Sequence, residues 1–322
     1  MRSYDVVIVN FNGEKIIADC LKSIVASSLK PEKIIIVDNA SNDNSIKIIE
    51  KLNISSVELI KSDKNIGFGP GNNLGMKKAE SEFILFMNND LLLDSKCAQN
   101  LIDGFTADDI AIINPLIING WDRKDESKVY SFGASLNDVG FGYSLTDIKE
   151  NNDDLTCFSG ACFMAKGKII KEVKFEPAFF LYYEEPEISA KILRKNLKIG
   201  RIKEAKCYHL ESYSSPKKAK DGIAFRQYYG IQNRWYMIGK HWPTKMIPKA
   251  IAINLVHLLF FSFFFLVNRK FSYLKLIYLA PYKFLMGTTK RYKSSHSLAQ
   301  KLTRDSISSY LGLGKKVLKK ED

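Results

Sequence analysis

Residues 65–90 read NIGFGPGNNLGMKKAESEFILFMNND, and this stretch is the most informative part of the chain. Four glycines among its first eleven residues allow the backbone to approach a ligand closely. The apolar run at 83–87 has the length and composition of a buried strand, and Asn88-Asn89-Asp90 follows where that run stops. Ligands of open α/β sheets bind beyond the carboxyl ends of the strands. A carboxylate flanked by amides at such a place suits a hard divalent cation and a phosphorylated ligand.

The first half of the chain alternates between short apolar runs and amphipathic segments. The strands and helices expected there are, in chain order, 5–9, 14–27, 33–37, 42–52 and 57–60. This alternation is typical of βαβ units and predicts a Rossmann-like half, which a helix after Pro70 and the strand at 83–87 complete. Asn10 and Asn12 follow the first strand and Asp38 ends the second, so we expect their loops to lie side by side.

These motifs, in this order, resemble the family 2 glycosyltransferases, which are inverting enzymes of GT-A fold. The resemblance is greatest to the rhamnosyltransferase-like branch, which carries N-x-G-F-(x)n-N-x-G and then a strand that ends L-N-x-D. It covers residues 4–241. The fold class that it implies is α/β, with a GT-A Rossmann-like mixed sheet flanked by helices and a C-terminal amphipathic or hydrophobic helical extension.

The resemblance implies a nucleoside-diphosphate sugar as the donor substrate. Asp38 matches the family aspartate that accepts a hydrogen bond from the base of the donor. The structural alternative is a turn aspartate that caps the next helix. The residues that the resemblance assigns to donor binding are Asn10, Asn12, Asp38, Asn65, Gly67, Asn73, Asn88 and Asn89.

Asn88-Asn89-Asp90 corresponds to the D-x-D element of GT-A enzymes, with Asn88 in place of the first aspartate. This exchange removes one negative charge, so we expect weaker metal binding than two carboxylates would give. His209, 24 residues after Glu185, matches a metal-binding histidine of the family. A lone histidine is often only structural. The resemblance thus implies that Asp90 and His209 hold Mg²⁺ or Mn²⁺.

Residues 175–195, FEPAFFLYYEEPEISAKILRK, resemble the family motif F-F-x-Y-x-E-D-x-D, in which the first Asp is the catalytic base. Glu185 occupies that position with a side chain one methylene longer, and Glu187 replaces the second Asp. Glu184 remains an alternative, because a base must lie within hydrogen-bond reach of the acceptor hydroxyl. Carboxylates around Pro186 also suit a helix N-terminus, where the dipole stabilises them without any catalytic role.

The rest of the catalytic half gives weaker signals. Residues 117–156 are polar and contain glycine, which predicts a hairpin or loop that shapes a cleft. The turn Gly160-Ala161-Cys162, after a short strand, resembles a family turn beside the acceptor site, and tight packing explains it almost as well. The further elements expected are short helices at 166–173 and 186–195, short strands at 200–202 and 207–209, and helices from 222 onward.

The net charge of +13 is concentrated in the last third of the chain. Residues 1–200 carry 24 Lys and Arg against 29 Asp and Glu, whereas residues 201–322 carry 24 against 6. Aromatic and apolar runs accompany this basic charge, which favours an anionic membrane surface over nucleic acid as a partner. We therefore expect a GT-A catalytic domain over 1–220 and a basic, membrane-associating helical region over 221–322.

Two apolar stretches, 250–267 and 271–286, lie in the basic region. The first has 18 residues, at the lower limit for a membrane span. Basic sequence flanks both stretches, so a single span conflicts with the positive-inside rule. In-plane helices or a re-entrant hairpin avoid the conflict, and a buried helix pair is a third reading. With no C-x-x-C pair and no secretory signal, we expect peripheral or re-entrant attachment to the cytoplasmic face of the inner (plasma) membrane.

The sequence therefore predicts a metal-dependent, inverting hexosyltransferase. The membrane region favours a lipid-linked saccharide acceptor, as in bacterial surface polysaccharide synthesis, and the branch resemblance suggests dTDP-rhamnose as donor. A sugar-phosphate nucleotidyltransferase shares the Rossmann-like half but needs a loop rich in glycine and arginine after the first strand, and NFNGEK lacks arginine. A non-catalytic basic membrane- or RNA-binding protein explains the tail but leaves the Asn-Asn-Asp and Glu-Glu motifs without a role.

Overall fold

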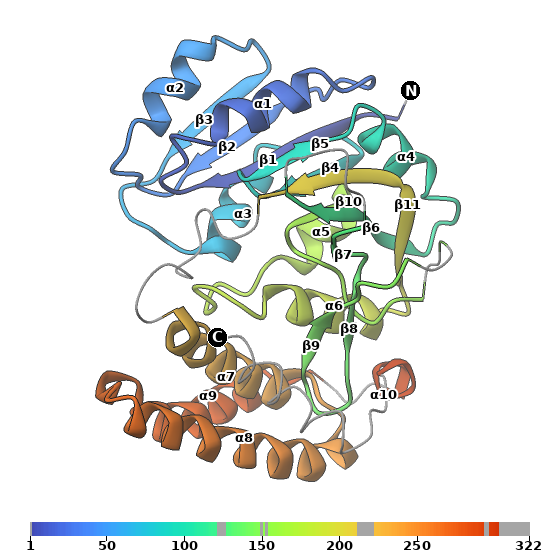
Figure 1. Cartoon of the computed structure of the whole chain (residues 1–322). Coiled ribbons are helices and arrows are strands. Elements are labelled where there is room, and N and C mark those ends of the chain that lie inside the picture. Colours follow the sequence, from blue (N-terminus) through green and yellow to red (C-terminus); the bar gives the residue numbers. More distant parts are fainter. Residues whose placement is uncertain are drawn as a thin grey trace.

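A nine-stranded mixed sheet organises the first two thirds of the protein (Figure 1). The computed structural model describes residues 2–120, 127–148, 151, 154–210, 222–292 and 296–302. The strands of the sheet are β1 (Tyr4–Asn10), β2 (Ile34–Asp38), β3 (Val57–Lys61), β4 (Phe83–Met87), β5 (Leu91–Leu93), β6 (Ile110–Asn119), β7 (Val129–Ser131), β10 (Cys162–Lys166) and β11 (Lys198–His209). Their spatial order is β3-β2-β1-β4-β10-β6-β11-β5, with β7 paired to β6.

The first four strands pair in parallel, and β10 then runs antiparallel to β4. Because parallel neighbours end at the same edge, Asn10 lies beside Asp38 in the register of β1 and β2. Beyond β10, β6 is antiparallel to β10, β11 is parallel to β6, and β5 is antiparallel to β11. This mixed sheet agrees with the predicted α/β class.

Helices cover both faces of the sheet. One layer contains α1 (Ile17–Val25), α2 (Ser45–Leu52) and α4 (Cys97–Asp103), and the other contains α3 (Phe68–Met76), α5 (Gly167–Val173) and α6 (Glu184–Arg194). Strand residues alternate between the two layers, so Val6 and Ile8 pack under α1 while Val7 packs under α3. All five cysteines are buried and unpaired.

The glycines of α3 allow that helix to lie close to the sheet. A Cβ on Gly75 would stand 2.7 Å from Val7 Cγ1, and one on Gly71 would stand 3.0 Å from the Val9 methyl carbons. The sequence suggested that these glycines let the backbone approach a ligand. At positions 71 and 75 the interpretation was wrong, because the close neighbours are side chains of β1 and β2.

Two helices begin earlier than expected. The helix predicted after Pro70 begins at Phe68, and the helix predicted from Pro186 begins at Glu184. Each proline falls in the first helical turn, where its missing N–H has no intrahelical partner to lose.

The strands around β10 and β11 also differ from the prediction. The expected strands 200–202 and 207–209 form one strand, β11, whose register against β6 shifts between Ile202 and Lys206. Their β6 partners at the shift are Pro115 and Leu116, and a proline cannot donate a ladder hydrogen bond. The turn at residues 160–162 leads into β10 rather than following a strand.

Residues 117–156 partly form the predicted hairpin. The strands β8 (Ala134–Leu136) and β9 (Gly142–Ser144) pair with each other and extend from the sheet toward the C-terminal helices (Figure 1). Parts of this segment, residues 121–126, 149–150 and 152–153, lie outside the described residues.

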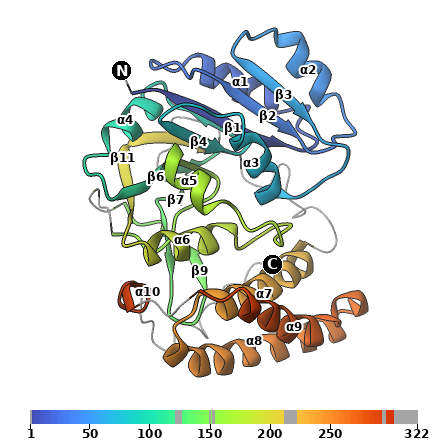
Figure 2. The same ribbon diagram turned by 180° about the vertical axis from the view of Figure 1, so that it is seen from behind.

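The C-terminal helices form a separate layer on the α6 side of the sheet (Figures 1 and 2). They are α7 (Gly222–His241), α8 (Ile247–Val267), α9 (Leu276–Thr289) and the short α10 (His296–Lys301). A Cβ on Gly239 would stand 2.3 Å from Phe284 O, and one on Gly287 would stand 2.2 Å from Tyr236 O. The backbones of α7 and α9 therefore cross with no room for a side chain between them.

Pro281 lies inside α9. The predicted domain boundary after residue 220 stays a prediction, and residues 211–221 and 303–322 of the two predicted regions lie outside the described residues.

Candidate active site

Polar side chains at the carboxyl ends of β1, β2 and β4 form one buried hydrogen-bond chain. Asn89 Nδ2 donates to Asn10 Oδ1 at 2.7 Å, and Asn10 Nδ2 donates to Asp38 Oδ2 at 2.9 Å. All three side chains are buried. Three residues assigned to donor binding are thus brought together at one edge of the sheet.

The carboxylate of Asp38 holds the loops after β1 and β2 together. Its Oδ1 accepts from Ser41 N at 2.9 Å, and its Oδ2 accepts from Ser41 Oγ at 2.7 Å. Ser41 Oγ in turn accepts from Asn12 N at 2.9 Å, and Asn12 Oδ1 accepts from Asn42 N at 2.9 Å. Ser41 was missed by the sequence reasoning. Contact between Asp38 and the base of a donor stays a prediction.

A second polar pair holds the loop before α3. Asn39 Nδ2 donates to Asn65 Oδ1 at 2.9 Å, and Gly67 N donates to the same oxygen at 3.0 Å. Gly67 has a left-handed φ of 93°, and a Cβ there would stand 2.2 Å from Phe180 O. Glycine at this position therefore permits close approach of the chain segment that leads into α6.

Asn73 links α3 to the same segment. Its Nδ2 donates to Phe175 O at 2.9 Å, and its Oδ1 accepts from Phe175 N at 3.0 Å. Both ends of the amide are used within the protein. A role of Asn73 in donor binding stays a prediction, while the structure gives it a clear role in joining two loops.

The turn at 159–162 connects the end of β4 with the predicted base. Asn88 N donates to Ala161 O at 2.9 Å. A Cβ on Gly160 would stand only 1.9 Å from Glu185 Oε1, so the Glu185 carboxyl lies directly on this turn. The half-buried Asn88 and the predicted base Glu185 therefore both lie against the turn at residues 159–162.

Asn114 of β6 holds that turn in place. Its Nδ2 donates to Ser159 O at 3.1 Å and to Cys162 O at 2.8 Å, and its Oδ1 accepts from Ser159 N at 3.0 Å. The sequence reasoning missed Asn114. A signal was present, because it is a polar residue in the middle of an apolar strand.

The two adjacent glutamates differ in their electrostatic environment. Glu184 is 2% exposed, and its Oε1 has no hydrogen-bond partner among the described residues. Burial and then the nearby Glu185 raise the pKa of Glu184 well above its usual value. Burial also raises the pKa of Glu185, but backbone N–H groups of Glu185 and Gly160 partly offset this. Glu185 therefore has backbone contacts that favour its ionised form, which suits a proton acceptor.

Glu187 belongs to a buried ion cluster between α6 and α7. Its carboxylate pairs with Lys191 Nζ at 2.8 Å, with Lys240 Nζ at 2.9 Å and with His241 Nε2 at 3.0 Å. Burial alone would raise the pKa of Glu187, but the His241 hydrogen bond and the two lysines lower it to about 2. The residue in the place of the second family aspartate thus ties two helices together.

Asp90 and His209 form a second pair at the sheet edge. His209 Nε2 lies 3.1 Å from Asp90 Oδ1, and both side chains are buried. The pairing of β5 with β11 brings them together, since Leu91 is the register partner of His209. The His209 ring also packs edge-on against Tyr130, with centroids 4.4 Å apart.

This donor set fits a hard divalent cation. Asp90 would supply a carboxylate oxygen and His209 an imidazole nitrogen, and these two atoms already lie 3.1 Å apart. Among the described residues no group of three or more His, Cys, Asp or Glu side chains gathers. Mg²⁺ commonly takes one or two carboxylates and completes its shell with water and substrate phosphates, so a two-residue site is sufficient.

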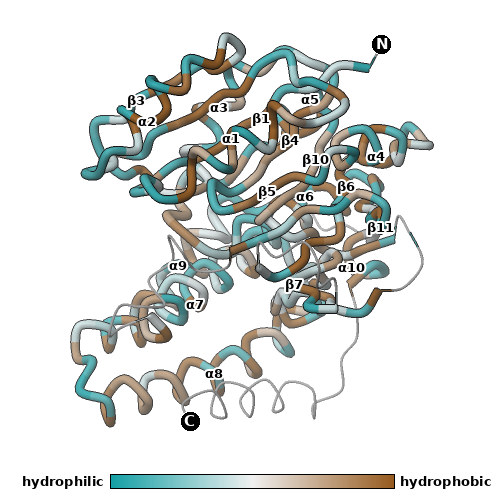
Figure 3. The backbone as a smooth tube through the Cα atoms, turned by 45° about the horizontal axis from the view of Figure 1, so that its top comes forward, coloured by the Kyte–Doolittle hydropathy of each residue, from teal (hydrophilic) through white to brown (hydrophobic). Residues whose placement is uncertain are grey.

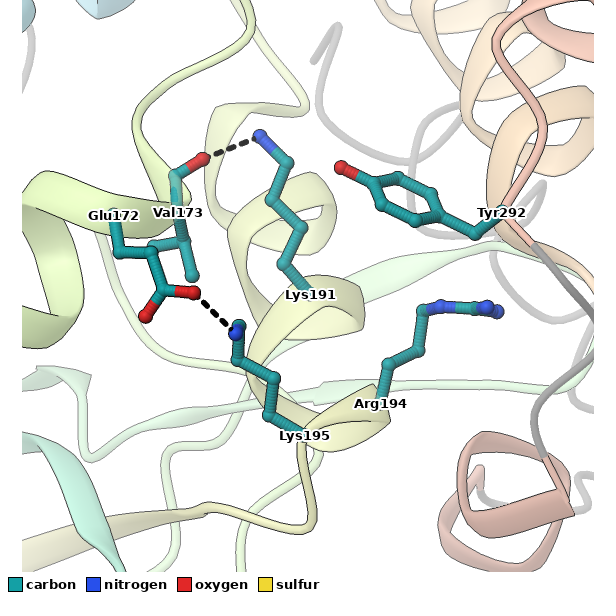
Figure 4. A pocket seen from close by; sticks show the side chains of 6 residues that line it. All are labelled: Glu172, Val173, Lys191, Arg194, Lys195 and Tyr292. Carbon is teal, nitrogen blue, oxygen red and sulfur yellow. Dashed lines mark hydrogen bonds and ion pairs between the residues drawn. The ribbon is translucent and has the colours of Figure 1, made fainter.

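A cleft of about 340 Å³ lies at the other end of α6 and is not part of this site (Figure 4). Its cations already have partners. Lys191 Nζ donates to Val173 O at 2.9 Å, and Lys195 Nζ donates to Glu172 Oε1 at 2.6 Å. The remaining lining residues are Arg194 and Tyr292.

The chain matches glycosyl transferase family 2 over residues 5–174, which is more than half of its length. It belongs to that family. A further match, to the low-salt glycan biosynthesis hexosyltransferase Agl10 of Haloferax volcanii, is 22% identical over 235 residues and covers 71% of this chain and 73% of that protein.

Two bacterial relatives match less of their own length. The chain is 24% identical over 217 residues to the O-antigen chain rhamnosyltransferase RfbN of Salmonella typhimurium, covering 65% of this chain and 66% of that protein. It is 31% identical over 128 residues to the poly(ribitol-phosphate) beta-N-acetylglucosaminyltransferase TarS of Staphylococcus aureus, covering 37% of this chain and 22% of that protein.

Solved structures of GT-A glycosyltransferases confirm the predicted fold class. GalNAc-T7 with UDP, GalNAc and Mn²⁺ matches with a TM-score of 0.63 and 16% identity, covering 79% of this chain and 50% of that chain. The mannosyltransferase PcManGT of Pyrobaculum calidifontis, in complex with GDP-Man and Mn²⁺, matches with a TM-score of 0.53 and 14% identity, covering 98% and 81%. At sequence identities of 16% and 14%, the similarity to these two structures shows a shared fold and no more.

We predict that Gly160→Ala abolishes most sugar transfer without unfolding the protein. The new methyl group would occupy the place of Glu185 Oε1, and the displaced group is the end of a flexible side chain. Loss of a positioned base lowers transfer about 10²-fold or more. Initial rates and thermal unfolding measure the two effects. Gly230→Ala is the matched control, because its Cβ meets only the Tyr183 ring at 3.6 Å. A wild-type rate for Gly160→Ala would contradict the placement of Glu185.

Proposed function

We propose that this family 2 member is an inverting glycosyltransferase that moves a sugar from a nucleoside-diphosphate sugar to a hydroxyl of a lipid-linked saccharide, in bacterial surface polysaccharide synthesis. The family membership supports the reaction class. The observation that carries the proposal is the Glu185 carboxyl seated on the turn that also holds the backbone of Asn88, two residues before Asp90.

The proposed donor is a nucleoside-diphosphate sugar, and dTDP-rhamnose is the specific candidate. A solved TarS complex contains UDP-GlcNAc, and the PcManGT complex contains GDP-Man. The likeness to RfbN, named a rhamnosyltransferase, supports rhamnose as the sugar. The buried amide chain at the sheet edge supports a ligand that needs fixed hydrogen-bond partners.

In the proposed reaction the acceptor oxygen attacks the anomeric carbon of the donor while Glu185 accepts the hydroxyl proton. The new bond joins acceptor oxygen to anomeric carbon, and the bond from that carbon to the diphosphate breaks. Burial and then the neighbouring Glu185 raise the pKa of Glu184, which disfavours a second negative charge beside the anionic donor. Asp90 and His209 would hold Mg²⁺ or Mn²⁺, which supplies charge neutralisation for the diphosphate leaving group.

We also propose that α8 and α9 rest on a membrane. The inner side of α8 packs against the protein through residues such as Leu258 and Phe265, yet its outer side is also apolar, with Val256 63% and Phe263 66% exposed. Figure 3 shows the hydrophobic colouring along this helix. A helix that is apolar all round is normally buried in protein or lipid. On α9 the exposed apolar residues are Ile277, Tyr278, Tyr282 and Leu285.

The charge of this layer suits anionic lipid. Residues 222–302 contain 13 Lys and Arg and no Asp or Glu. Each basic residue close to an anionic leaflet contributes about 1 kcal/mol. The proposed partner is therefore an anionic membrane surface, and the proposed location is the cytoplasmic face of the plasma membrane.

The contacts of α8 favour in-plane attachment over a span. Residues 244–267 are long and apolar enough to cross a membrane, and 33% of the most apolar window is buried in the protein. Two residues of α8 contact the loop that joins β8 to β9. Asn254 Nδ2 donates to Val139 O at 2.8 Å, and Lys249 Nζ pairs with the Asp138 carboxylate at 2.6 Å. A helix tied to the catalytic body in this way has only one side available to lipid.

The other functions considered have less support. The match to glycosyl transferase family 2 is not explained if the protein is a sugar-phosphate nucleotidyltransferase or a non-catalytic membrane- or RNA-binding protein. The relatives described above are all named as glycosyltransferases.

Glu185→Gln should retain donor binding and lose transfer by about 10²–10⁴-fold, because an amide cannot accept the hydroxyl proton. The pH profile gives an independent check. Burial raises the pKa of Glu185 above its ordinary value of 4.5. Because a base acts only when it is ionised, kcat of the wild type should increase with pH, and the midpoint of this increase should lie above pH 4.5. Steady-state rates and nucleotide-sugar binding measure these effects. An inactive Glu184→Gln together with an active Glu185→Gln would reverse the assignment.

Asp90→Asn should lower transfer by about 10²-fold or more while the fold is retained, because it removes the only carboxylate of the proposed metal pair. EDTA should inactivate the wild type, and added Mn²⁺ or Mg²⁺ should restore it. Asp19→Asn, at an exposed position on α1, is the matched control. Unchanged wild-type activity in EDTA would rule out the metal-dependent mechanism.

Replacement of two outward residues of α8, in the double variant Leu259→Ser and Phe263→Ser, should weaken binding to phosphatidylglycerol vesicles roughly 10²-fold. These side chains are 57% and 66% exposed, so little packing is lost. Ile148→Ser is the matched control, since Ile148 is 52% exposed and lies in another part of the chain. Vesicle co-sedimentation gives the affinities.

Washing of native membranes separates in-plane attachment from a span. High salt or alkaline carbonate should partly release the wild type, because salt screens the charge attraction. Complete resistance to both washes would overturn in-plane attachment. Full solubility without a membrane fraction would overturn the lipid-linked acceptor.

A further inference from the structure

Two consecutive tyrosines directly before the catalytic glutamates have a left-handed backbone. The φ angles are 69° for Tyr182 and 73° for Tyr183. Bulky L-residues rarely adopt this conformation, and a run of two persists only where the surroundings hold it. Neither residue is glycine, asparagine or aspartate, which tolerate it best.

One turn of α7 holds this strained pair. Asn233 Nδ2 donates to Leu181 O at 3.1 Å and to Tyr182 O at 2.9 Å. The adjacent Arg234 donates from NH1 to Tyr183 Oη at 2.8 Å. Asn233 is 2% exposed, so water does not readily replace its amide.

The held segment leads straight into the site. Tyr183 is the residue before α6, and Glu184 and Glu185 form the first turn of that helix. A change in φ at Tyr182 would rotate the chain that carries both carboxyl groups. The Glu187 pairs with Lys240 and His241 attach the next part of α6 to the end of α7. Helix α7 thus contacts the catalytic helix on both sides of Glu185.

We propose that Asn233 is a positioning residue for the catalytic base. By holding the carbonyl oxygens of Leu181 and Tyr182, it maintains the left-handed pair and so keeps the Glu185 carboxyl on the Gly160 turn. The proposal rests on the proposed function of Glu185. It differs from a purely structural role, which would change the melting temperature without a selective change in kcat.

The first experiment compares Asn233→Ala with Gln232→Ala. Both positions are buried amides on the same helix, but among the residues that the structure describes Gln232 donates only to Tyr228 O, within α7. Asn233→Ala should lower kcat for transfer roughly ten- to a hundredfold, because a small misplacement of a catalytic group is costly, and should leave the donor KM within about threefold. Gln232→Ala should keep the wild-type kcat. Equal effects on both would overturn the proposal.

The second experiment uses glycine to remove the strain. Glycine adopts positive φ without a steric penalty, so the Tyr182→Gly background should need the clamp less. We expect Asn233→Ala to lower kcat by a smaller factor in that background than in the wild type. The same factor in both backgrounds would show that Asn233 does not act through the backbone of Tyr182. If Asn233→Ala does not fold, Asn233→Ser replaces it in both comparisons.

The role of Glu185 as the base and the positioning role of Asn233 can be refuted separately. Full activity of Glu185→Gln would refute the base and, with it, the proposed function of this site. An inactive Glu185→Gln beside a wild-type kcat for Asn233→Ala would refute only the positioning role. Thermal unfolding of every variant ensures that the rates compare folded proteins.

Discussion

The buried chain from Asn89 through Asn10 to Asp38 is the constraint on which the site depends. The Asn10 amide accepts on one side and donates on the other, so the chain has one direction and ends on a carboxylate. A buried polar group left without its partner costs about 1–3 kcal/mol. A slip of β1 against β2 or β4 would break both bonds at once. The network therefore favours the register in which Asn88-Asn89-Asp90 lies beside the loops of its neighbours, and the other parts of the site assemble against this edge.

Contacts distant in sequence place the carboxyl groups of Glu184 and Glu185 on that edge. Gly67 lets the loop before α3 touch the backbone of Phe180, and Gly160 leaves space for Glu185. On the opposite side Asn233 holds the strained tyrosines. Burial and the neighbouring Glu185 raise the pKa of Glu184 well above its usual value, and backbone N–H groups partly offset the effect of burial on the pKa of Glu185. The two neighbouring glutamates thus differ in their surroundings and in what shifts their pKa values, and the local sequence does not specify these surroundings.

The sequence predicted those features whose signal is local. The runs that form β1 to β4 and the helices between them follow period and composition, and the family motifs indicated Asp90 and His209, which the structure brings to 3.1 Å. It did not predict features that depend on partners far along the chain. Asn114 holds Ser159 across 45 residues, and α9 continues through Pro281. The glycines of α3 were interpreted as ligand-facing because spacing alone does not reveal what fills the space above them.

The C-terminal layer is packed too closely on the catalytic body to be treated as a detachable anchor. Helix α7 shares one apolar cluster with α8 and α9 and another with α6, and Ile231 and Trp235 are buried under the layer. A truncation at residue 244 would expose both side chains and loosen the helix that contacts the tyrosines before Glu185. Reduced activity of such a truncated protein would therefore not show that the membrane delivers the acceptor. Substitutions on the outer side of α8 leave that packing intact, so only they separate membrane contact from the positioning of the base.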